Sequence, residues 1–397
     1  MKTDISRGAK GSDRIEFANS LRGVAAVSVV IAHLGQMFWV GQPVVALFTG
    51  LPALSLERPW FTKVFDVTHV DLGPFGVGLF FVISGFVIPF SLVRYDARAF
   101  LTGRLLRIYP TYWVGFSITA AAILIGAAFF GGATTFTAKE LTLHYFPPLR
   151  AIFYSRALDG IAWTLEIELF FYLLCATIAG AIGRGRRWVG FVPLVLFAAW
   201  LPAFAFVAHA PAGFEKIARR FEVAADYLPF VIFMFTGVAL NFRQRGLIGR
   251  GAASAWIGAC VAMFMLAWAT QFLGEGWLKL MVGLIDPEAY LLALALFLIA
   301  MAGQNYFTAH PALRFVAAIS YPLYVVHGVA GYVMLQILVG HGVGPTAALA
   351  ATLIAVFVAA WLIHRFVETP THSYGQKLAR GMAAQDRAGA AAQAAIS

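Results

Sequence analysis

Apolar runs of about 20 residues recur along the whole chain and leave few folds open to it. Each run is long enough to cross about 30 Å of hydrocarbon as a helix. The runs lie near residues 17–39, 74–93, 108–130, 160–182, 188–208, 224–241, 252–273, 283–302, 313–339 and 346–367. Backbone polar groups in lipid must be paired internally, which a helix achieves. The ten runs therefore predict an all-α polytopic membrane protein with about ten transmembrane helices.

Composition excludes the soluble classes of protein. Of the 397 residues, 60% are hydrophobic and 12% are charged, which is far from the balance of a soluble domain. The net charge of +10 comes largely from loop arginines, so it indicates membrane topology and not a nucleic-acid partner. The two cysteines, Cys175 and Cys260, both lie in apolar runs, and we interpret them as packing residues without a disulfide.

Basic residues gather in alternate loops. One set of loops holds Arg94, Arg98, Arg104 and Arg107, then Arg184, Arg186 and Arg187, then Arg243, Arg245 and Arg250. The opposite loops, such as 57–71 and 215–226, carry charges of mixed sign. The positive-inside rule then predicts that the basic loops and both termini are cytoplasmic. We expect a multi-pass protein of the cell inner membrane.

Polar segments at the two ends define the expected domain boundaries. Residues 1–13 are expected to form a cytoplasmic N-terminal segment and residues 14–375 a transmembrane domain. Residues 376–397 are expected to form a cytoplasmic tail that is disordered or a short surface helix. The first apolar run is too long for a signal peptide and lacks a small-residue cleavage site, so we expect it to be retained.

An arginine and a histidine enter the first apolar run eleven residues apart, at Arg22 and His33. On an α-helix this separation puts both side chains on one face, about 16 Å apart along the axis. Titratable groups in hydrocarbon mark a functional site, because each needs a partner or a wet cavity. Histidine is a competent general base at neutral pH. A structural histidine bonded to a carbonyl is the alternative.

Two arginines at the start of the third run could bind an anion. Arg104 and Arg107 are three residues apart and share a helix face, which suits two-pronged contacts with phosphate oxygens. The alternative is that these arginines only set the orientation of the protein in the membrane, which requires no ligand.

Small residues interrupt the otherwise bulky second run at Gly76, Gly78, Ser84 and Gly85. Another backbone or a substrate can approach the helix at these positions. We therefore include Ser84 among the candidate cavity residues, with ordinary helix packing as the alternative.

Trp163 at the start of the fourth run is a candidate substrate or cavity residue, and two carboxylates, Glu166 and Glu168, follow it. The helix dipole explains Glu166 as a stabilising charge in a first turn. Glu168 lies deeper, at a depth comparable with His33, so the two could share a cavity. Carboxylates two residues apart face different directions, so they are not a metal-ligand pair and we expect no metal.

A second histidine, His327, follows Tyr324 in the ninth run. Pro322 is expected to bend this helix. His327 and Tyr324, together with Arg365 and Glu368 from the end of the last run, could line the same cavity as His33 or only brace it. His364, Arg365 and Glu368 end the last run and are interpreted as interfacial charges.

These blocks, in this order, resemble the acyltransferase 3 family of integral membrane acyltransferases. The resemblance covers most of residues 14–375. It is most specific at residues 20–33, 80–86, 104–110, 163–172, 320–327 and 368–370. Two positions depart from the family pattern: Asn19 stands where an aspartate is usual, and Gly103 where a further arginine often occurs.

The resemblance implies an acyltransferase that moves an acyl group, most often acetyl, from acyl-CoA to a carbohydrate or lipid hydroxyl. It implies His33 as catalytic base, with Glu168 supporting the histidine or the acceptor. It also implies that Arg22, Arg104 and Arg107 bind the phosphates of acetyl-CoA or another acyl-CoA.

The expected partners are acyl-CoA, a carbohydrate or glycolipid acceptor and membrane lipids. A homo-oligomer and a separate periplasmic partner both stay open. The principal alternative is a transporter or flippase for a glycan or lipid intermediate, in which the buried charges would carry protons or substrate.

Overall fold

Helices form all the regular structure in the computed structural model, which describes residues 5–68, 70–132, 136–153, 155–211, 213–271, 286–306 and 310–396. No strand occurs in these residues, so the predicted all-α class is confirmed. In chain order the helices, with short 3₁₀ and π segments labelled η, are α1 (Ile5–Val30), η1 (Ile31–Met37), α2 (Phe38–Val40), α3 (Gln42–Thr49), η2 (Trp60–Thr62), α4 (Lys63–Thr68), α5 (Leu72–Leu92), α6 (Ala97–Phe129), α7 (Ala138–His144), α8 (Pro147–Ile152), α9 (Ala162–Thr177), α10 (Ala179–Gly183), η3 (Arg187–Phe191), α11 (Val192–Ala208), α12 (Glu215–Gln244), α13 (Arg250–Gln271), α15 (Pro287–Ala302), η4 (Gln304–Tyr306), α16 (Pro311–Val326), α17 (Val329–Gly340), α18 (Pro345–Ile363), η5 (His364–Glu368) and α19 (Thr369–Ile396).

Several of these helices are long and apolar enough to cross a membrane. Within the described residues, seven meet this condition: Glu16–Val40, Leu72–Leu92, Ala97–Phe129, Arg187–Ala208, Arg220–Gln244, Arg250–Thr270 and Pro345–Asp386. An eighth crossing results if α16 and α17, bent by 72° at a short break, count as one span. The chain is therefore a polytopic membrane protein.

The remaining predicted runs form shorter helices. The run 160–182 is divided between α9 and α10, and the run 283–302 contains the 16-residue α15. Residues 272–273 and 283–285 of the predicted runs lie outside the described residues. The count of ten transmembrane helices therefore stays a prediction.

Helix α5 lies at the centre of the bundle and packs against α1, α12 and α15. Its contact with α12 depends on two glycines. A Cβ added at Gly85 would overlap the Met234 carbonyl oxygen, and one at Gly237 would overlap the Val82 carbonyl oxygen. Backbones can come this close only where side chains are missing, as is common between membrane helices.

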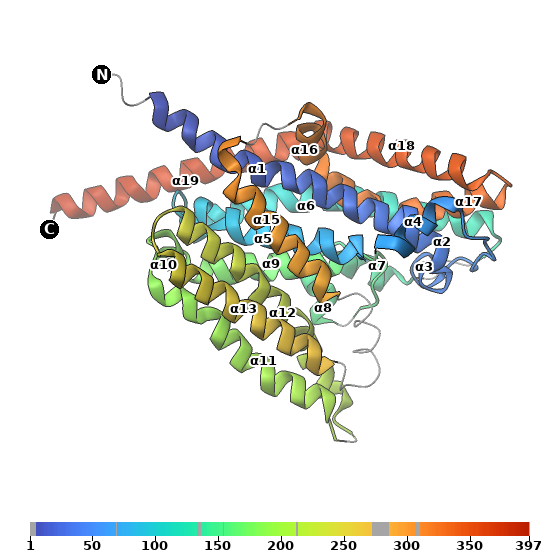
Figure 1. The fold of residues 1–397 in the computed structure, drawn as a ribbon, viewed down its shortest axis with the longest axis horizontal. Coiled ribbons are helices and arrows are strands. Elements are labelled where there is room, and N and C mark those ends of the chain that lie inside the picture. Colours follow the sequence, from blue (N-terminus) through green and yellow to red (C-terminus); the bar gives the residue numbers. More distant parts are fainter. Residues whose placement is uncertain are drawn as a thin grey trace.

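The beginning of α1 and the end of α19 lie at the same end of the bundle, at the left of Figure 1, and α2, α3 and α17 lie at the opposite end. Helix α19 packs against α6 and continues as helix to Ile396. It therefore includes residues 376–396 of the segment expected to be a tail.

Within the residues that the structure describes, two π-helical segments interrupt the long helices. Segment η1 contains His33 and joins α1 to α2. Segment η5 contains His364 and Glu368 and joins α18 to α19. Such segments are uncommon and often occur at functional sites, because the extra residue in the turn redirects side chains.

Candidate active site

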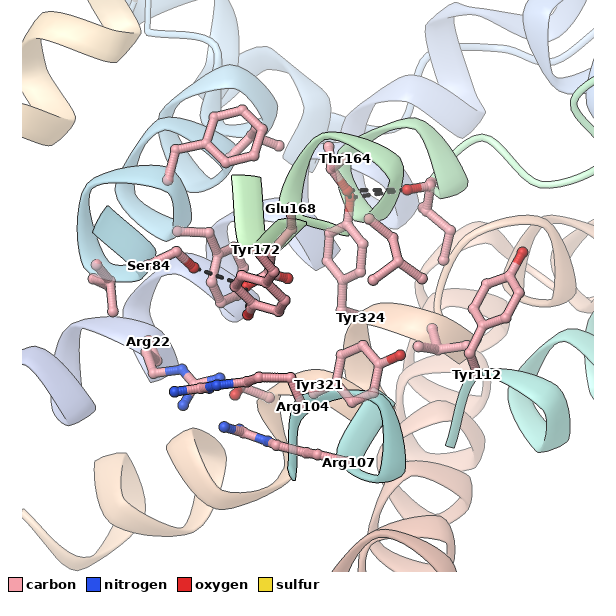
Figure 2. Close-up of a pocket in the computed structure, with 18 of the residues that line it drawn as sticks. Arg22, Ser84, Arg104, Arg107, Tyr112, Thr164, Glu168, Tyr172, Tyr321 and Tyr324 are labelled. Carbon is pink, nitrogen blue, oxygen red and sulfur yellow. Dashed lines mark hydrogen bonds between the residues drawn. The ribbon is translucent and has the colours of Figure 1, made fainter. Parts of the chain in front are cut away.

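A partly open cavity lies among α1, α5, α6, α9 and α16 and is drawn in Figure 2. Its lining combines charged and hydroxyl-bearing side chains with apolar ones from α5 and α9. Of the residues predicted for the site, six line it: Arg22, Ser84, Arg104, Arg107, Glu168 and Tyr324. The fold thus brings residues from five separate helices to one place.

Three guanidinium groups lie close together on one wall of the cavity (Figure 2). Arg104 donates to the Ser91 hydroxyl at 2.9 Å and lies over the Tyr172 ring, 5.5 Å from its centroid. The Arg107 Nε lies 3.6 Å from the Glu368 Oε1. Arg22 makes no hydrogen bond or ion pair with the residues that the structure describes. This wall can therefore attract an anion.

Glu168 lies near these arginines (Figure 2). Its Oε1 accepts hydrogen bonds from the Ser84 hydroxyl at 2.8 Å and from the Tyr172 hydroxyl. The two donors fix the orientation of the carboxylate at the edge of the cavity. No hydrogen bond joins Glu168 to His33 in the described chain.

His33 is paired instead with His327. The His33 Nδ1 and His327 Nε2 atoms are 2.9 Å apart, and the two rings are stacked with centroids 4.9 Å apart. Neither ring belongs to the cavity lining. The ring of Tyr324, which does line the cavity, lies 5.6 Å from that of His327, so the histidine pair adjoins the cavity at this tyrosine.

Two further side chains lie on the α9 side of the site. The Tyr324 hydroxyl is 2.5 Å from the Thr164 hydroxyl, and both residues line the cavity. Trp163 lies outside the lining and packs against Phe230, with ring centroids 5.4 Å apart. Its predicted role in binding substrate stays a prediction.

Glu368 is a site residue whose partner the sequence analysis did not identify. Its side chain is buried, with its Oε1 3.6 Å from Arg107 Nε and its Oε2 2.7 Å from His364 Nδ1. Glu368 is therefore the buried partner of a cavity arginine, a contact that its interpretation as an interfacial charge did not include. The four-residue spacing of His364 and Glu368 was the available signal, since such residues meet on a helix.

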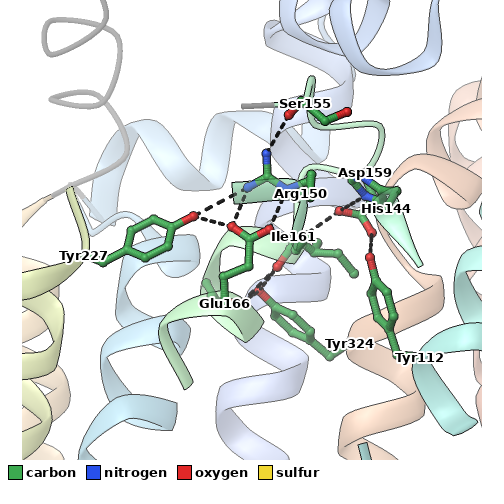
Figure 3. A network of polar contacts seen from close by, with 11 residues as sticks. Tyr112, His144, Arg150, Ser155, Asp159, Ile161, Glu166, Tyr227 and Tyr324 are labelled. Carbon is green, nitrogen blue, oxygen red and sulfur yellow. Dashed lines mark hydrogen bonds and ion pairs between the residues drawn. The ribbon is translucent and has the colours of Figure 1, made fainter. Parts of the chain in front are cut away.

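A second polar cluster lies beside the site and is drawn in Figure 3. Arg150 donates two hydrogen bonds to the Glu166 carboxylate, which also accepts one from the Tyr227 hydroxyl. Glu166 is thus held in a buried ion pair, whereas the sequence suggested only a helix-dipole charge. These contacts fix α8, α9 and α12 to one another.

Asp159 completes the second polar cluster (Figure 3). One carboxylate oxygen accepts from the Ala162 N–H at 2.8 Å and lies 3.2 Å from His144 Nε2. The other accepts from the Tyr112 hydroxyl at 3.2 Å. Tyr112 also lines the cavity, so this cluster braces the cavity wall.

Comparison with known proteins identifies the family. Residues 15–365 match the family described as an acyltransferase domain. Nodulation protein 10 of Rhizobium leguminosarum bv. viciae is 29% identical over 226 residues, which are 53% of this chain and 53% of that protein. Exopolysaccharide production protein ExoZ of Rhizobium meliloti (strain 1021) is 28% identical over 341 residues, which are 82% of this chain and 96% of that protein. No solved structure matches.

The two relatives differ in how much of their length aligns with this chain. The chain spans about half the length of Nodulation protein 10 and nearly all of ExoZ. The family match includes the three cavity arginines and both paired histidines. It confirms the resemblance seen in the sequence motifs, and the chain belongs to this family of acyltransferases.

Proposed function

We propose that this protein is a membrane O-acyltransferase that moves an acyl group, acetyl in the simplest case, from acyl-CoA to a hydroxyl of a carbohydrate or glycolipid. The observation that carries the proposal is Arg22, which makes no hydrogen bond or ion pair in the described chain and lies beside Arg104 and Arg107 on one cavity wall. Guanidinium groups in an apolar bundle need an anion to offset their desolvation, and phosphate oxygens suit them well.

The donor binds along the length of the cavity. Its phosphates contact the three guanidinium groups, and its pantetheine arm lies against the apolar wall that Val77, Phe80 and Leu165 help to form. The thioester then lies near Tyr324, the lining residue next to the histidine pair. Arg22 and His33 are eleven positions apart on a continuous helical segment, which corresponds to about 16 Å.

His33 acts as the general base. It takes the proton from the acceptor hydroxyl while that oxygen attacks the thioester carbonyl. The new C–O bond forms, the C–S bond breaks, and the CoA thiolate leaves and takes the proton back from the imidazolium. The products are the acyl ester and free CoA. A covalent acyl-histidine relay is the alternative route to the same products.

The proposed protein lies in the cell inner membrane. It has ten transmembrane helices and both termini in the cytoplasm. The loop arginines support this orientation through the positive-inside rule. The common position of the start of α1 and the end of α19 is consistent with an even number of crossings (Figure 1). The guanidinium wall then faces the cytoplasmic supply of acyl-CoA.

The acceptor is an exported or cell-surface polysaccharide or its lipid-linked precursor. Support comes from the relative whose name states a part in exopolysaccharide production, ExoZ, which aligns with 82% of this chain. At 28% identity this likeness suggests the class of acceptor and not the particular sugar.

Acyl transfer by the purified protein tests the proposal. The protein in lipid nanodiscs is incubated with acyl-labelled acetyl-CoA and a glycan extract of its host, and the glycans are analysed by mass spectrometry. We expect label in ester linkage on the glycan and release of free CoA. Glycan that crosses the membrane of a reconstituted vesicle without modification would instead indicate a transporter or flippase.

A further inference from the structure

We propose that His327 is a positioning residue that fixes which nitrogen of His33 carries a proton. This inference rests on the proposed function, because it gives His327 a part in making His33 a base. The two residues are 294 positions apart in the sequence, and the sequence alone left the role of His327 open.

The hydrogen bonds of His327 determine its own protonated nitrogen. Its Nδ1 lies 2.8 Å from the Tyr324 carbonyl oxygen and 3.1 Å from that of Leu323. A carbonyl oxygen can only accept, so Nδ1 carries the proton and donates. In a neutral imidazole the other nitrogen, Nε2, is then an acceptor.

The proton on His33 follows from this. Because His327 Nε2 is an acceptor, the contact of 2.9 Å requires His33 Nδ1 to carry the proton and donate. The Nε2 atom of His33 is therefore unprotonated and has the lone pair that a general base needs. That atom has no hydrogen-bond partner in the described chain and is not among the buried unpaired atoms, so it faces accessible space.

A neutral pair is the state that the surroundings favour. His327 is fully buried, and no carboxylate forms an ion pair or hydrogen bond with either ring within the described residues. The aromatic rings beside the pair are those of Tyr324 and Tyr332. A second proton on either histidine would place an uncompensated charge in an apolar environment, which is costly.

The local backbone explains why these contacts form. The helix breaks at Gly328 with a bend of 72°, so the Tyr324 carbonyl has no N–H group from the next turn and accepts from the His327 ring. On the other side, the π-helical segment η1 presents His33 to that ring. The helix break at Gly328 and the π-helical segment η1 thus both help to bring His33 and His327 into contact.

Two substitutions of His327 separate its two hydrogen bonds. In His327→Gln, the longer amide reaches the place of Nε2, and its oxygen can accept from His33 Nδ1. In His327→Asn, the shorter amide reaches only the place of Nδ1, so it can satisfy the Tyr324 carbonyl but leaves His33 without its acceptor. His327→Leu removes both contacts and keeps the volume.

We expect His327→Gln to keep kcat within about fivefold of the wild type. His327→Asn and His327→Leu should lower kcat by about 10²- to 10³-fold, as expected when a base loses its correct tautomer. The KM for acyl-CoA should not change, because the arginines are untouched. Equal kcat values for the Gln and Asn variants, at equal melting temperature, would overturn the proposal.

Nitrogen NMR of the histidine rings provides a readout independent of activity. With ¹⁵N-labelled histidine, and His33 assigned by its loss in His33→Gln, we expect an unprotonated Nε2 on His33 in the wild type and in His327→Gln. In His327→Asn that signal should move towards the average of two tautomers. An unchanged His33 signal in His327→Asn would contradict the proposal.

Failure of this inference can be told apart from failure of the proposed function. If His33→Ala abolishes acyl transfer while His327→Asn leaves kcat and the His33 signal unchanged, the function stands and the positioning role is wrong. If His33→Ala transfers acyl groups at the wild-type rate, the role of His33 as a base is wrong whatever its tautomer.

Discussion

The Arg107 guanidinium lies 3.6 Å from the Glu368 carboxylate, which it shares with His364, and the Glu368 side chain is buried. An anionic ligand that binds Arg107 must compete with this internal carboxylate. The carboxylate keeps the arginine in place when no donor is bound, and it lowers the net positive charge of the wall.

Glu368→Gln should therefore destabilise the ligand-free protein, because it leaves the partly buried Arg107 without its counter-ion. The melting temperature should be lower than in the wild type, and the rise on adding CoA should be larger, because phosphates then supply the missing negative charge. Thermal unfolding with and without CoA measures both values. An equal rise in the two proteins would contradict competition between Glu368 and the donor.

Arg22→Ala should weaken donor binding without lowering stability. Arg22 makes no hydrogen bond or ion pair in the described chain, so its removal breaks no internal contact of either kind. Loss of a charge-assisted hydrogen bond corresponds to a KM for acetyl-CoA about 10- to 100-fold higher. Steady-state kinetics with Arg186→Ala as control, an exposed arginine outside the cavity lining, would separate binding from a general charge effect. Parallel changes in both variants would speak against a donor site.

Gly85→Ala should destabilise the bundle. The added Cβ would overlap the Met234 carbonyl oxygen in the contact between α5 and α12, and overpacking of this kind costs about 1–3 kcal/mol. Gly258→Ala is the matched control, because a Cβ there meets nothing within 4 Å and alanine favours a helix by about 1 kcal/mol. Melting temperatures should fall in the first variant and not in the second.

Asp159 should make stability depend on acid pH. Burial by itself raises the pKa of Asp159, but the facing His144, the Ala162 N–H and Arg150 outweigh it, and the net pKa lies below the usual value. The ionised carboxylate thus stabilises the fold above the unfolded-state pKa of about 3.9, and this contribution is lost as pH falls through the lower folded-state pKa.

Asp159→Asn should for that reason lower the melting temperature at pH 7, and the difference from the wild type should shrink as pH falls below about 4. Differential scanning fluorimetry across this range measures the difference. A gap that stays constant down to acid pH would show that the charge of Asp159 does not contribute.

Hydropathy predicted the long helices well, because a span needs only a run of apolar residues. It did not reveal the division of residues 160–182 at Ile178, where the backbone leaves the helical region without a proline or glycine. Pro322 predicted a bend in the ninth run, but Pro322 lies inside α16 and the break lies further on, at Gly328. Packing against neighbouring helices determines where these helices end, and hydropathy does not report it.

The sequence predicts contacts between site residues on one helix, but not contacts between residues on different helices. Arg104 and Arg107 share one helix, so their spacing alone places them together. The pairing of His33 with His327 joins helices far apart in the sequence, and nothing in a single sequence fixes which side chains meet across a bundle. The same holds for Arg150 and Glu166, which come from two helices, α8 and α9.

Acyl transfer by His33→Ala, compared with the wild type in the same nanodiscs, is the most direct test of the mechanism. We expect the variant to insert and to bind CoA as the wild type does, and to transfer labelled acetyl to the glycan at least about 10²-fold more slowly, because it lacks the general base. Transfer at the wild-type rate by the correctly inserted variant would contradict His33 as the catalytic base.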